Sequence, residues 1–518
     1  MITYKLLSLI FKSMEPKSQD DQKQGFSVPQ PSQVSQGSPL YRHPESTTPT
    51  QEVKPEEPIS PLAPKPVFEE SNLKKGDIVP PAPKRKLPKF LFPLFAALLL
   101  FFIVFLVIKM IIPRLKGQAI KEIVWWGLWE DEVIIKPLIE EYEGKNPGVK
   151  IKYVKNSPQD YRERLTNALA KGEGPDIFRF HNTWVPMFAN ELDNIPASFM
   201  GAGEYAQVFY PVITSDLSSG AGLVGVPIGY DALTLFINEE IFEKENLNPP
   251  TTWIELRDIA KRLTKVENGR IVQAGVALGR TENVDHWPEI LGLMLLQNQV
   301  NLSRPQGKLA EDALKFFTLF SLVDGVWDET LPPSTVYFAS GKLAMYFGPS
   351  WRAFNFKEQN PDLRFKTVSL PQLPKEKETE PNFSYATYWV EGVWERSKNK
   401  ELAWDFLKFV ASRNSLENFF KKASNTRGFG EAYPRADMRE LLLDHPILGS
   451  IVRLAPEARS WYLASRTFDG PTGINSQINK YFEDAINAIN EGMPPTKALE
   501  PVTQGVTQVL SQYGLVKK

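Results

Sequence analysis

Residues 121–154 read KEIVWWGLWEDEVIIKPLIEEYEGKNPGVKIKYV, and their apolar pattern is the clearest indication of the fold class. Its apolar residues predict a strand at 121–126, a helix at 130–143 that Gly144 closes, and a second strand at 149–154. Amphipathic helices that alternate with short apolar strands are typical of α/β domains. The pattern therefore predicts an α/β fold.

The same alternation continues towards the C-terminus. A cap residue and a proline at 157–160 predict a helix that Gly172 ends, and GPDIFRF at 174–180 predicts a third strand. Thr252 and Glu255 have the spacing of a capping box, with an apolar stripe behind them. One-sided apolar patterns predict further helices around 402–410 and 478–489.

Two tryptophans are predicted to be core residues rather than ligand contacts. Trp253 and Trp404 each lie inside one of these helical patterns. Aromatic side chains at helical spacing pack most often against the interior of the domain.

Towards the N-terminus, residues 90–108 form an uncharged apolar run, FLFPLFAALLLFFIVFLVI. A helix of this length covers about 28 Å, close to the hydrocarbon thickness of a bilayer. The alternative is a buried core helix, but the run has no polar face and both flanks are basic. We expect one transmembrane signal anchor within residues 88–113, retained because a long segment precedes it.

Basic residues set the expected orientation of this helix. Six lie before it and four after it, which favours a cytoplasmic N-terminus and an extracytoplasmic C-terminal domain. They are Lys74, Lys75, Lys84, Arg85, Lys86 and Lys89 on one side, and Lys109, Arg114, Lys116 and Lys121 on the other.

Residues 1–87 are predicted to be a disordered, Pro-rich cytoplasmic tail. Fourteen of the 43 prolines fall between residues 13 and 87, where large apolar residues are scattered. Such a segment cannot bury enough surface to offset its chain entropy. All twelve tryptophans lie beyond residue 120, so the folded part is expected there. Met14 is a second credible start besides Met1.

Composition excludes several classes of function. The net charge is -1, without the clustered basic surface that nucleic-acid binding needs. The chain has no cysteine, which excludes a disulfide framework, a thiol nucleophile, a Cys-ligated metal and a lipid-modified cysteine anchor. Signatures of zinc hydrolases, phosphate-binding loops, dinucleotide sites and nucleophile elbows are absent from the sequence. Neither a cofactor nor a metal is expected.

Six segments in order resemble the sugar-binding proteins of bacterial ABC importers, the maltose-binding-protein-like group of extracellular solute-binding proteins. They cover about 400 residues after the apolar run. The segments are GPDI (174–177), GVPIGYDALTLFINEEIFEKENLNPPTTWIEL (225–256), FASGKLAMYFGPSW (338–351), SLPQLP (369–374), ERSKNKELAWDFLKFVAS (395–412) and INKYFEDAINAINEGMPPTKALEPV (478–502). The family usually has a cleavable signal or a lipid-anchored cysteine, and this chain shows neither.

The resemblance implies a type II periplasmic-binding-protein-like fold, in which two α/β lobes close on a ligand by a hinge. It implies a binding domain at 119–518, with one lobe at 119–230 and 337–380 and the other at 233–330 and 393–518. The chain would cross between the lobes near 229–233, 331–336 and 382–392. It also implies a carbohydrate ligand and ABC permease subunits as partners.

Ligand residues are expected where strands end at the cleft, because aromatic rings cover the faces of sugars and polar groups bind their hydroxyls. Side chains alternate along a strand, so Trp125 and Trp126 cannot both face the cleft. His181 is expected at the rim as a packing residue. The predicted ligand-binding residues are Trp129, Glu130, Asn182, Trp184, Tyr230, Asp231, Trp351, Tyr388, Trp389, Trp461 and Arg466.

Four readings of the function stay open on the sequence. The first is a membrane-anchored receptor that delivers a carbohydrate to an ABC importer without catalysis. The second is the same fold with another cargo, such as a peptide, a polyol or a glycerol phosphate. The third is an anchored sensor or adhesin that uses the same cleft. The fourth is a secreted carbohydrate hydrolase, since paired carboxylates are the machinery of glycoside cleavage.

Overall fold

The computed structural model describes residues 97–106, 109, 120–220, 222–375, 377 and 379–516. The predicted disordered tail at 1–87 lies outside the described residues. Of the predicted transmembrane segment, residues 97–106 are helical with exposed side chains, and most of the remainder lies outside the described residues. Among the described helices, none is long and apolar enough to cross a bilayer.

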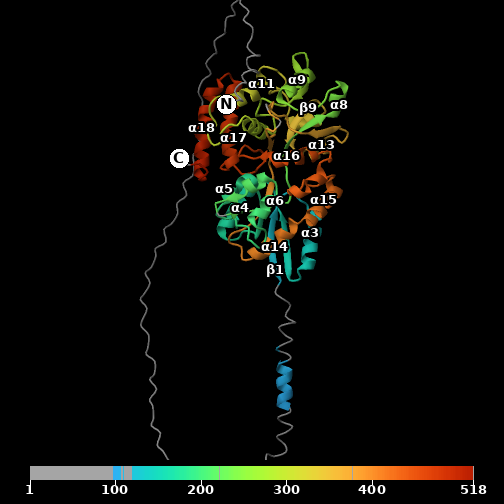
Figure 1. Ribbon diagram of the computed structural model, residues 1–518, viewed down its shortest axis with the longest axis vertical. Helices are drawn as coiled ribbons and strands as arrows, with labels where there is room; N and C mark the ends of the chain where they lie inside the picture. The colour runs from blue at the N-terminus through green and yellow to red at the C-terminus, as the bar shows by residue number, and fades with distance from the viewer. Residues whose placement is uncertain are drawn as a thin grey trace, which may run out of the picture. The chain divides into compact units, whose positions relative to one another are not determined.

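All of the described sheets lie between residues 121 and 459, and the two larger sheets define two lobes (Figure 1). The sheet of the first lobe has the strand order β12-β3-β1-β2. Its three N-terminal strands are parallel, and β12 runs antiparallel beside β3. These strands are β1 (Lys121–Gly127), β2 (Val149–Lys155), β3 (Ile177–His181) and β12 (Trp389–Val393).

Helices cover this sheet because their apolar faces need a surface to pack on. Ile135 and Leu138 of one helix and Phe406 of another are buried in the same core as Ile123 and Trp125 of β1. The helical segments of this lobe are α3 (Glu132–Lys145), α4 (Tyr161–Lys171), η1 (Asn182–Trp184), α5 (Val185–Phe188), α6 (Ala202–Val208), α7 (Pro211–Asp216), α14 (Lys400–Val410), α15 (Arg413–Arg427) and η2 (Ala436–Leu442).

The sheet of the second lobe has the order β10-β6-β9-β8-β7. β9 pairs antiparallel with β6 and parallel with β8. The strands are β6 (Leu233–Asn238), β7 (Lys265–Glu267), β8 (Arg270–Val276), β9 (Leu343–Pro349) and β10 (Phe365–Val368).

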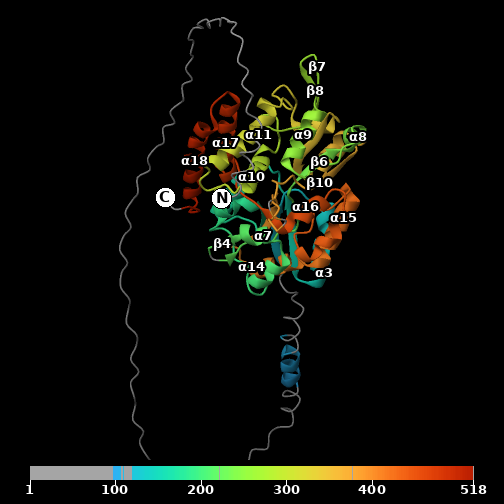
Figure 2. The same cartoon turned by 45° about the horizontal axis from the view of Figure 1, so that its top comes forward.

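Figure 2 shows α8 and α9 beside this sheet, whereas α17 and α18 pack against each other and against α11. The helical segments of the second lobe are α8 (Glu239–Lys244), α9 (Trp253–Leu263), α10 (Trp287–Gln297), α11 (Lys308–Leu322), α12 (Ser334–Ala339), α13 (Arg352–Gln359), α16 (Gly449–Leu454), α17 (Ile474–Asn490) and α18 (Pro495–Gln512).

Three short elements complete the part of the chain that the structure describes. Strands β11 (Ser384–Tyr385) and β13 (Ala458–Arg459) pair in parallel, and η3 (Ala455–Glu457) precedes β13. Strands β4 (Ser218–Ser219) and β5 (Gly222–Leu223) form a small antiparallel ribbon.

Several predicted elements are confirmed, and their local chemistry explains them. Both hydrogen bonds of the predicted capping box are present at the start of α9, between Thr252 and Glu255. Gly172 ends α4 in the left-handed conformation that glycine adopts without strain. Trp253 and Trp404 are buried as predicted. Gly144 does not close α3, which continues to Lys145.

The predicted division into lobes is wrong in two places. Residues 337–380 were expected in the first lobe, but β9 and β10 flank β6 in the sheet of the second. Part of 393–518 was expected in the second lobe, but α14 and α15 pack in the first lobe, against β12 and α3. The predicted crossing at 331–336 is absent, because α12 packs against β9. Apolar periodicity identifies strands and helices but carries no information on which sheet a strand joins.

The contact between α9 and β8 yields a stability prediction. A Cβ added at Gly275 would lie 2.1 Å from the carbonyl oxygen of Ala260, a backbone atom of the facing helix. We expect Gly275→Ala to lower the free energy of unfolding by about 1–3 kcal/mol, because the helix must move away from the sheet.

Gly144→Ala is the matched control, since an added Cβ there meets nothing within 4 Å. It should raise stability by about 0.5–1 kcal/mol, as alanine does inside a helix. Urea unfolding of the full chain measures both variants. Equal stability of the two would contradict the close helix–sheet contact.

Candidate functional site

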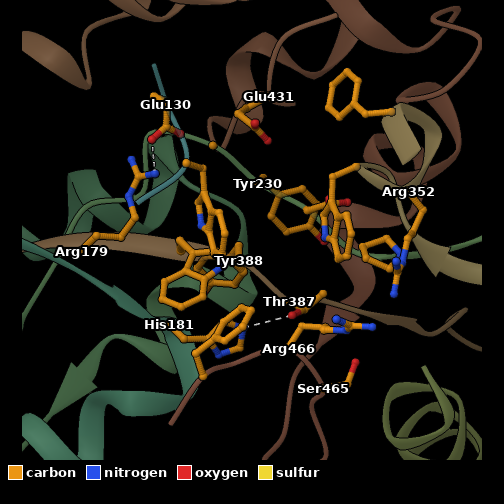
Figure 3. A pocket seen from close by; sticks show the side chains of 18 of the residues that line it. Glu130, Arg179, His181, Tyr230, Arg352, Thr387, Tyr388, Glu431, Ser465 and Arg466 are labelled. Carbon is orange, nitrogen blue, oxygen red and sulfur yellow. Dashed lines mark hydrogen bonds and ion pairs between the residues drawn. The ribbon is translucent and has the colours of Figure 1, made fainter. Parts of the chain in front are cut away.

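A cleft of about 480 Å³ is lined by residues from both lobes (Figure 3). Eight of the eleven residues predicted to bind a ligand line it, although they come from segments far apart in the sequence. They are Trp129, Glu130, Tyr230, Asp231, Trp351, Tyr388, Trp389 and Arg466. The ends of β1 and β3 and the start of β12 meet at this edge of the first sheet, which explains the convergence.

Aromatic rings line the cleft from both lobes. On the first lobe the Trp129 ring lies 5.6 Å from Trp389, edge to face, and 5.8 Å from Phe468. On the second lobe Trp351 follows β9, with the guanidinium of Arg352 4.4 Å from its ring. Aromatic rings that line a cleft offer flat apolar surfaces, which suit a flat apolar ligand face.

Glu130 belongs to a buried cluster of charges at the end of β1. Arg179 of β3 pairs with Glu130 and, at 2.5 Å, with Glu391 of β12. Glu391 also accepts a hydrogen bond from the indole nitrogen of Trp125 at 2.8 Å. Burial raises the pKa of Glu391, while the charge of Arg179 opposes that shift. One guanidinium therefore serves two buried carboxylates.

Asp231 lies on the segment that passes from the first lobe to the second. Its Oδ1 accepts hydrogen bonds from the backbone nitrogens of Ala232 (2.7 Å) and Ser350 (3.0 Å), and its Oδ2 accepts one from the Ser350 hydroxyl (2.9 Å). These bonds fix the residue directly before Trp351. Burial raises the pKa of Asp231 to about 7, and the nearby charge of Glu431 acts in the same direction.

Tyr230 and Tyr388 border the same crossing. Their rings lie 5.9 Å apart. The Tyr388 hydroxyl donates to Asp216 at 2.8 Å, whereas the buried Tyr230 hydroxyl has no hydrogen-bond partner among the described residues. Burial raises the pKa of Asp216 to about 6, although three hydrogen bonds to its carboxylate act in the opposite direction.

Three predicted ligand residues do not line the cleft. Asn182 is buried, with its amide donating to Asp216 at 2.9 Å and accepting from the Tyr388 nitrogen at 3.3 Å. Trp184 is fully buried and stacks on Tyr161. Trp461 packs beside Tyr462. The turn η1 directs the side chains of 182 and 184 inward, and a sequence pattern does not reveal that direction.

His181 lines the cleft, but both of its ring nitrogens are hydrogen-bonded to neighbouring residues. Its Nδ1 lies 2.8 Å from the Thr183 hydroxyl and its Nε2 lies 3.0 Å from the Thr387 hydroxyl. Burial lowers its pKa to about 3, so the ring is neutral at physiological pH. In the part of the chain that the structure describes, no three His, Asp or Glu side chains are grouped to hold a metal ion.

Sequence reasoning missed several cleft residues. Arg179, His286, Glu289 and Arg352 are all buried and line the cleft. One signal was available, because Glu289 is the only charged residue within the largely apolar WPEILGLMLLQ of α10. Buried charges are rare unless they are paired or functional, so such a residue marks a site.

Comparison with known proteins identifies related chains. The model of the family described as "Bacterial extracellular solute-binding protein" matches residues 129–414. A binding protein of Brucella abortus (strain 2308) is 23% identical over 341 residues, which make up 62% of this chain and 79% of that protein.

Solved structures share the fold. An ABC transporter solute-binding protein from Thermotoga lettingae, bound with α-D-tagatose, superposes with a TM-score of 0.58 and 22% identity over 75% of this chain and 100% of that one. The sugar-binding protein MalE from Xanthomonas citri gives a TM-score of 0.61 and 16% identity over 76% and 98%. At these identities the similarity demonstrates the two-lobed fold.

The raised pKa of Asp231 predicts a pH dependence of stability. Between its ordinary value of 3.8 and about 7, the native state binds a proton that the unfolded chain has released. This contribution is fully present below pH 3.8 and is lost as the pH rises through 7. Asp231→Asn removes it and keeps the acceptor for the two backbone nitrogens. We expect the variant to lose less stability than the wild type between pH 5 and pH 8.

Urea unfolding of the full chain at pH 5, 6 and 8 measures the difference. Asp216 has a shift of the same sign and remains in both proteins, so only the difference between them reports on Asp231. Parallel pH profiles would show that Asp231 is ionised throughout.

Proposed function

The chain belongs to the bacterial extracellular solute-binding proteins, and we propose that its cleft binds a carbohydrate and delivers it to the permease of an ABC importer. The observation that carries this proposal is that aromatic side chains of both lobes line the cleft together with charged and polar side chains. Sugars have apolar faces and a rim of hydroxyls, so they need both kinds of surface.

Related proteins support a carbohydrate as the cargo. The Thermotoga lettingae protein binds α-D-tagatose, and the Xanthomonas citri protein is a sugar-binding protein. In the proposed cycle the lobes close around the sugar by a hinge at the crossing segments, including Asp231, and open at the permease. The sugar is released unchanged, so the protein acts without catalysis.

We propose further that residues 90–108 anchor the protein in the cell membrane. The run is uncharged, its length matches a bilayer, and basic residues flank it. With residues 1–87 in the cytoplasm, the binding domain would face outward and stay near the permease. An anchored receptor samples a small volume, which raises its effective concentration at the transporter.

Trp351→Ala and Trp129→Ala test the proposed sugar cleft. Each removes one of these aromatic side chains, and truncating a central aromatic contact costs at least about tenfold in affinity. Isothermal titration of the full chain with α-D-tagatose, maltotriose, mannotriose, glycerol and glycerol 3-phosphate measures the effect.

Trp461→Ala is the matched control, because Trp461 is also partly exposed but does not line the cleft. It should leave the affinity unchanged. If the wild type binds glycerol 3-phosphate and none of the sugars, the cargo is not a carbohydrate. Sugar binding that survives both cleft substitutions would place the binding site elsewhere.

Deletion of residues 90–108 tests the proposed anchor. The full chain should sediment with membranes and resist alkaline carbonate, because an apolar helix of this length inserts stably. The deletion variant should appear in the soluble fraction. Deletion of residues 40–58, an equally long piece of the Pro-rich segment, should leave membrane association intact. Membrane association of both deletion variants would contradict the anchor.

A further inference from the structure

Three buried side chains and the half-buried Ser465 form a continuous hydrogen-bond chain beside the cleft. Arg352 Nε lies 2.8 Å from Nε2 of His286, whose Nδ1 lies 3.0 Å from the hydroxyl of Ser465. That hydroxyl donates to Oε1 of Glu289 at 2.9 Å, and the Ser465 backbone nitrogen donates to the same oxygen at 2.6 Å. Arg352 and Ser465 lie across the pocket from Glu130 and Arg179 (Figure 3).

The direction of each hydrogen bond in this chain is fixed by chemistry. A guanidinium has donors only, so Nε2 of His286 must accept and the ring proton lies on Nδ1. The Ser465 hydroxyl then accepts a hydrogen bond from Nδ1 of His286 and donates one to Oε1 of Glu289. Burial lowers the pKa of His286, and the charge of Arg352 acts in the same direction, which keeps the ring neutral.

At each end of this hydrogen-bond chain one polar atom makes no hydrogen bond. Oε2 of Glu289 and Nη2 of Arg352 are buried and have no hydrogen-bond partner among the described residues. The neutral His286 ring has its Nδ1 3.7 Å from the first atom, and Asp285 Oδ1 forms an ion pair with the second at 3.7 Å, so both distances are too long for a hydrogen bond. An unpaired buried acceptor or donor is costly, so both favour a partner in the cleft.

Two other arginines that line the cleft form ion pairs with neighbouring carboxylates. Arg466 pairs with Asp285 at 3.2 Å, and Arg427 pairs with Glu431. This part of the wall thus has a carboxylate oxygen and a guanidinium nitrogen that are buried without a hydrogen-bond partner among the described residues, on two side chains joined by the same hydrogen-bond chain. A hydroxyl pair satisfies both, since each hydroxyl can donate and accept. A carboxylate or phosphate offers acceptors only and would meet the charge of Glu289.

We propose that Glu289 and Arg352 determine the specificity of the cleft by binding two hydroxyl groups of a neutral sugar. Glu289 Oε2 accepts a hydrogen bond from one hydroxyl, and Arg352 Nη2 donates to the other. This inference rests on the proposed carbohydrate-binding function. It names a substrate class, a neutral sugar rather than a uronate or a sugar phosphate.

Glu289→Gln is the sharpest test, because it keeps an acceptor for Ser465 and replaces Oε2 by an amide donor. Isothermal titration of the full chain uses the tightest-binding of α-D-tagatose, maltotriose and mannotriose, together with its monodeoxy derivatives. We expect the substitution to weaken binding about 10- to 100-fold, the range for a hydrogen bond to a charged group.

Binding of the monodeoxy derivatives distinguishes a direct contact between Glu289 and the sugar from a structural effect of the substitution. One monodeoxy derivative should bind the wild type 10- to 100-fold more weakly, yet bind Glu289→Gln with little further loss. Asp312→Asn, a buried carboxylate on α11 outside the cleft, should keep the wild-type affinity for every derivative. Should Glu289→Gln fail to fold, Arg352→Lys carries the same test for the second hydroxyl, since the single nitrogen of lysine does not occupy the positions of both Nε and Nη2.

The outcomes are distinct. Wild-type affinity in Glu289→Gln, or a loss that is equal for all derivatives, overturns the assignment of Glu289 and leaves the carbohydrate receptor standing. Tighter binding of a uronate than of its neutral sugar overturns the neutral class. Failure of the wild type to bind any of the three sugars overturns both this inference and the proposed function.

Discussion

The site depends on one buried guanidinium. Arg179 on β3 lies between Glu130, which follows β1, and Glu391 on β12, so a single residue joins three segments of the first sheet. Removing one partner of such a cluster leaves an uncompensated buried charge, which is strongly destabilising. Trp129 and Trp389 sit on the segments that this cluster joins. The aromatic wall of the first lobe therefore depends on a charge interaction beneath it.

The second wall is held in a comparable way by polar contacts. Asp231 binds the backbone and hydroxyl of Ser350, so the crossing segment and the turn that carries Trp351 are one unit. A change in the crossing segment, where a hinge would act, is transmitted directly to an aromatic residue of the cleft. Only Asp231 and Ser350 are needed for this coupling, because their hydrogen bonds hold the two segments at fixed distances.

The sequence predicted the local elements well, because their causes are local. Alternating apolar residues identified β1 and β2, and the side chains of Thr252 and Glu255 identified the start of α9. The assignment of 337–380 to the first lobe failed because pairing of β9 with β6 is a long-range choice. Eight predicted residues line the cleft because strand ends converge there, whereas Asn182 and Trp184 turn inward. Arg179 and Arg352 were missed because burial of a charge is visible only once its partners are assembled, whereas Glu289 could have been found from its place in an apolar helix.

The position of β12 has a consequence for the order of folding during synthesis. This strand completes the first sheet, yet the chain reaches it only after β6 to β10 of the other lobe have been made. Domains usually fold in the order in which they leave the ribosome. The first sheet begins with β1 but lacks β12 until late in synthesis. All strands of the second sheet, β6 to β10, leave the ribosome one after another. Long-range pairing of this kind is slow, so the N-terminal lobe is the late folder and stays exposed to aggregation and proteases for longest.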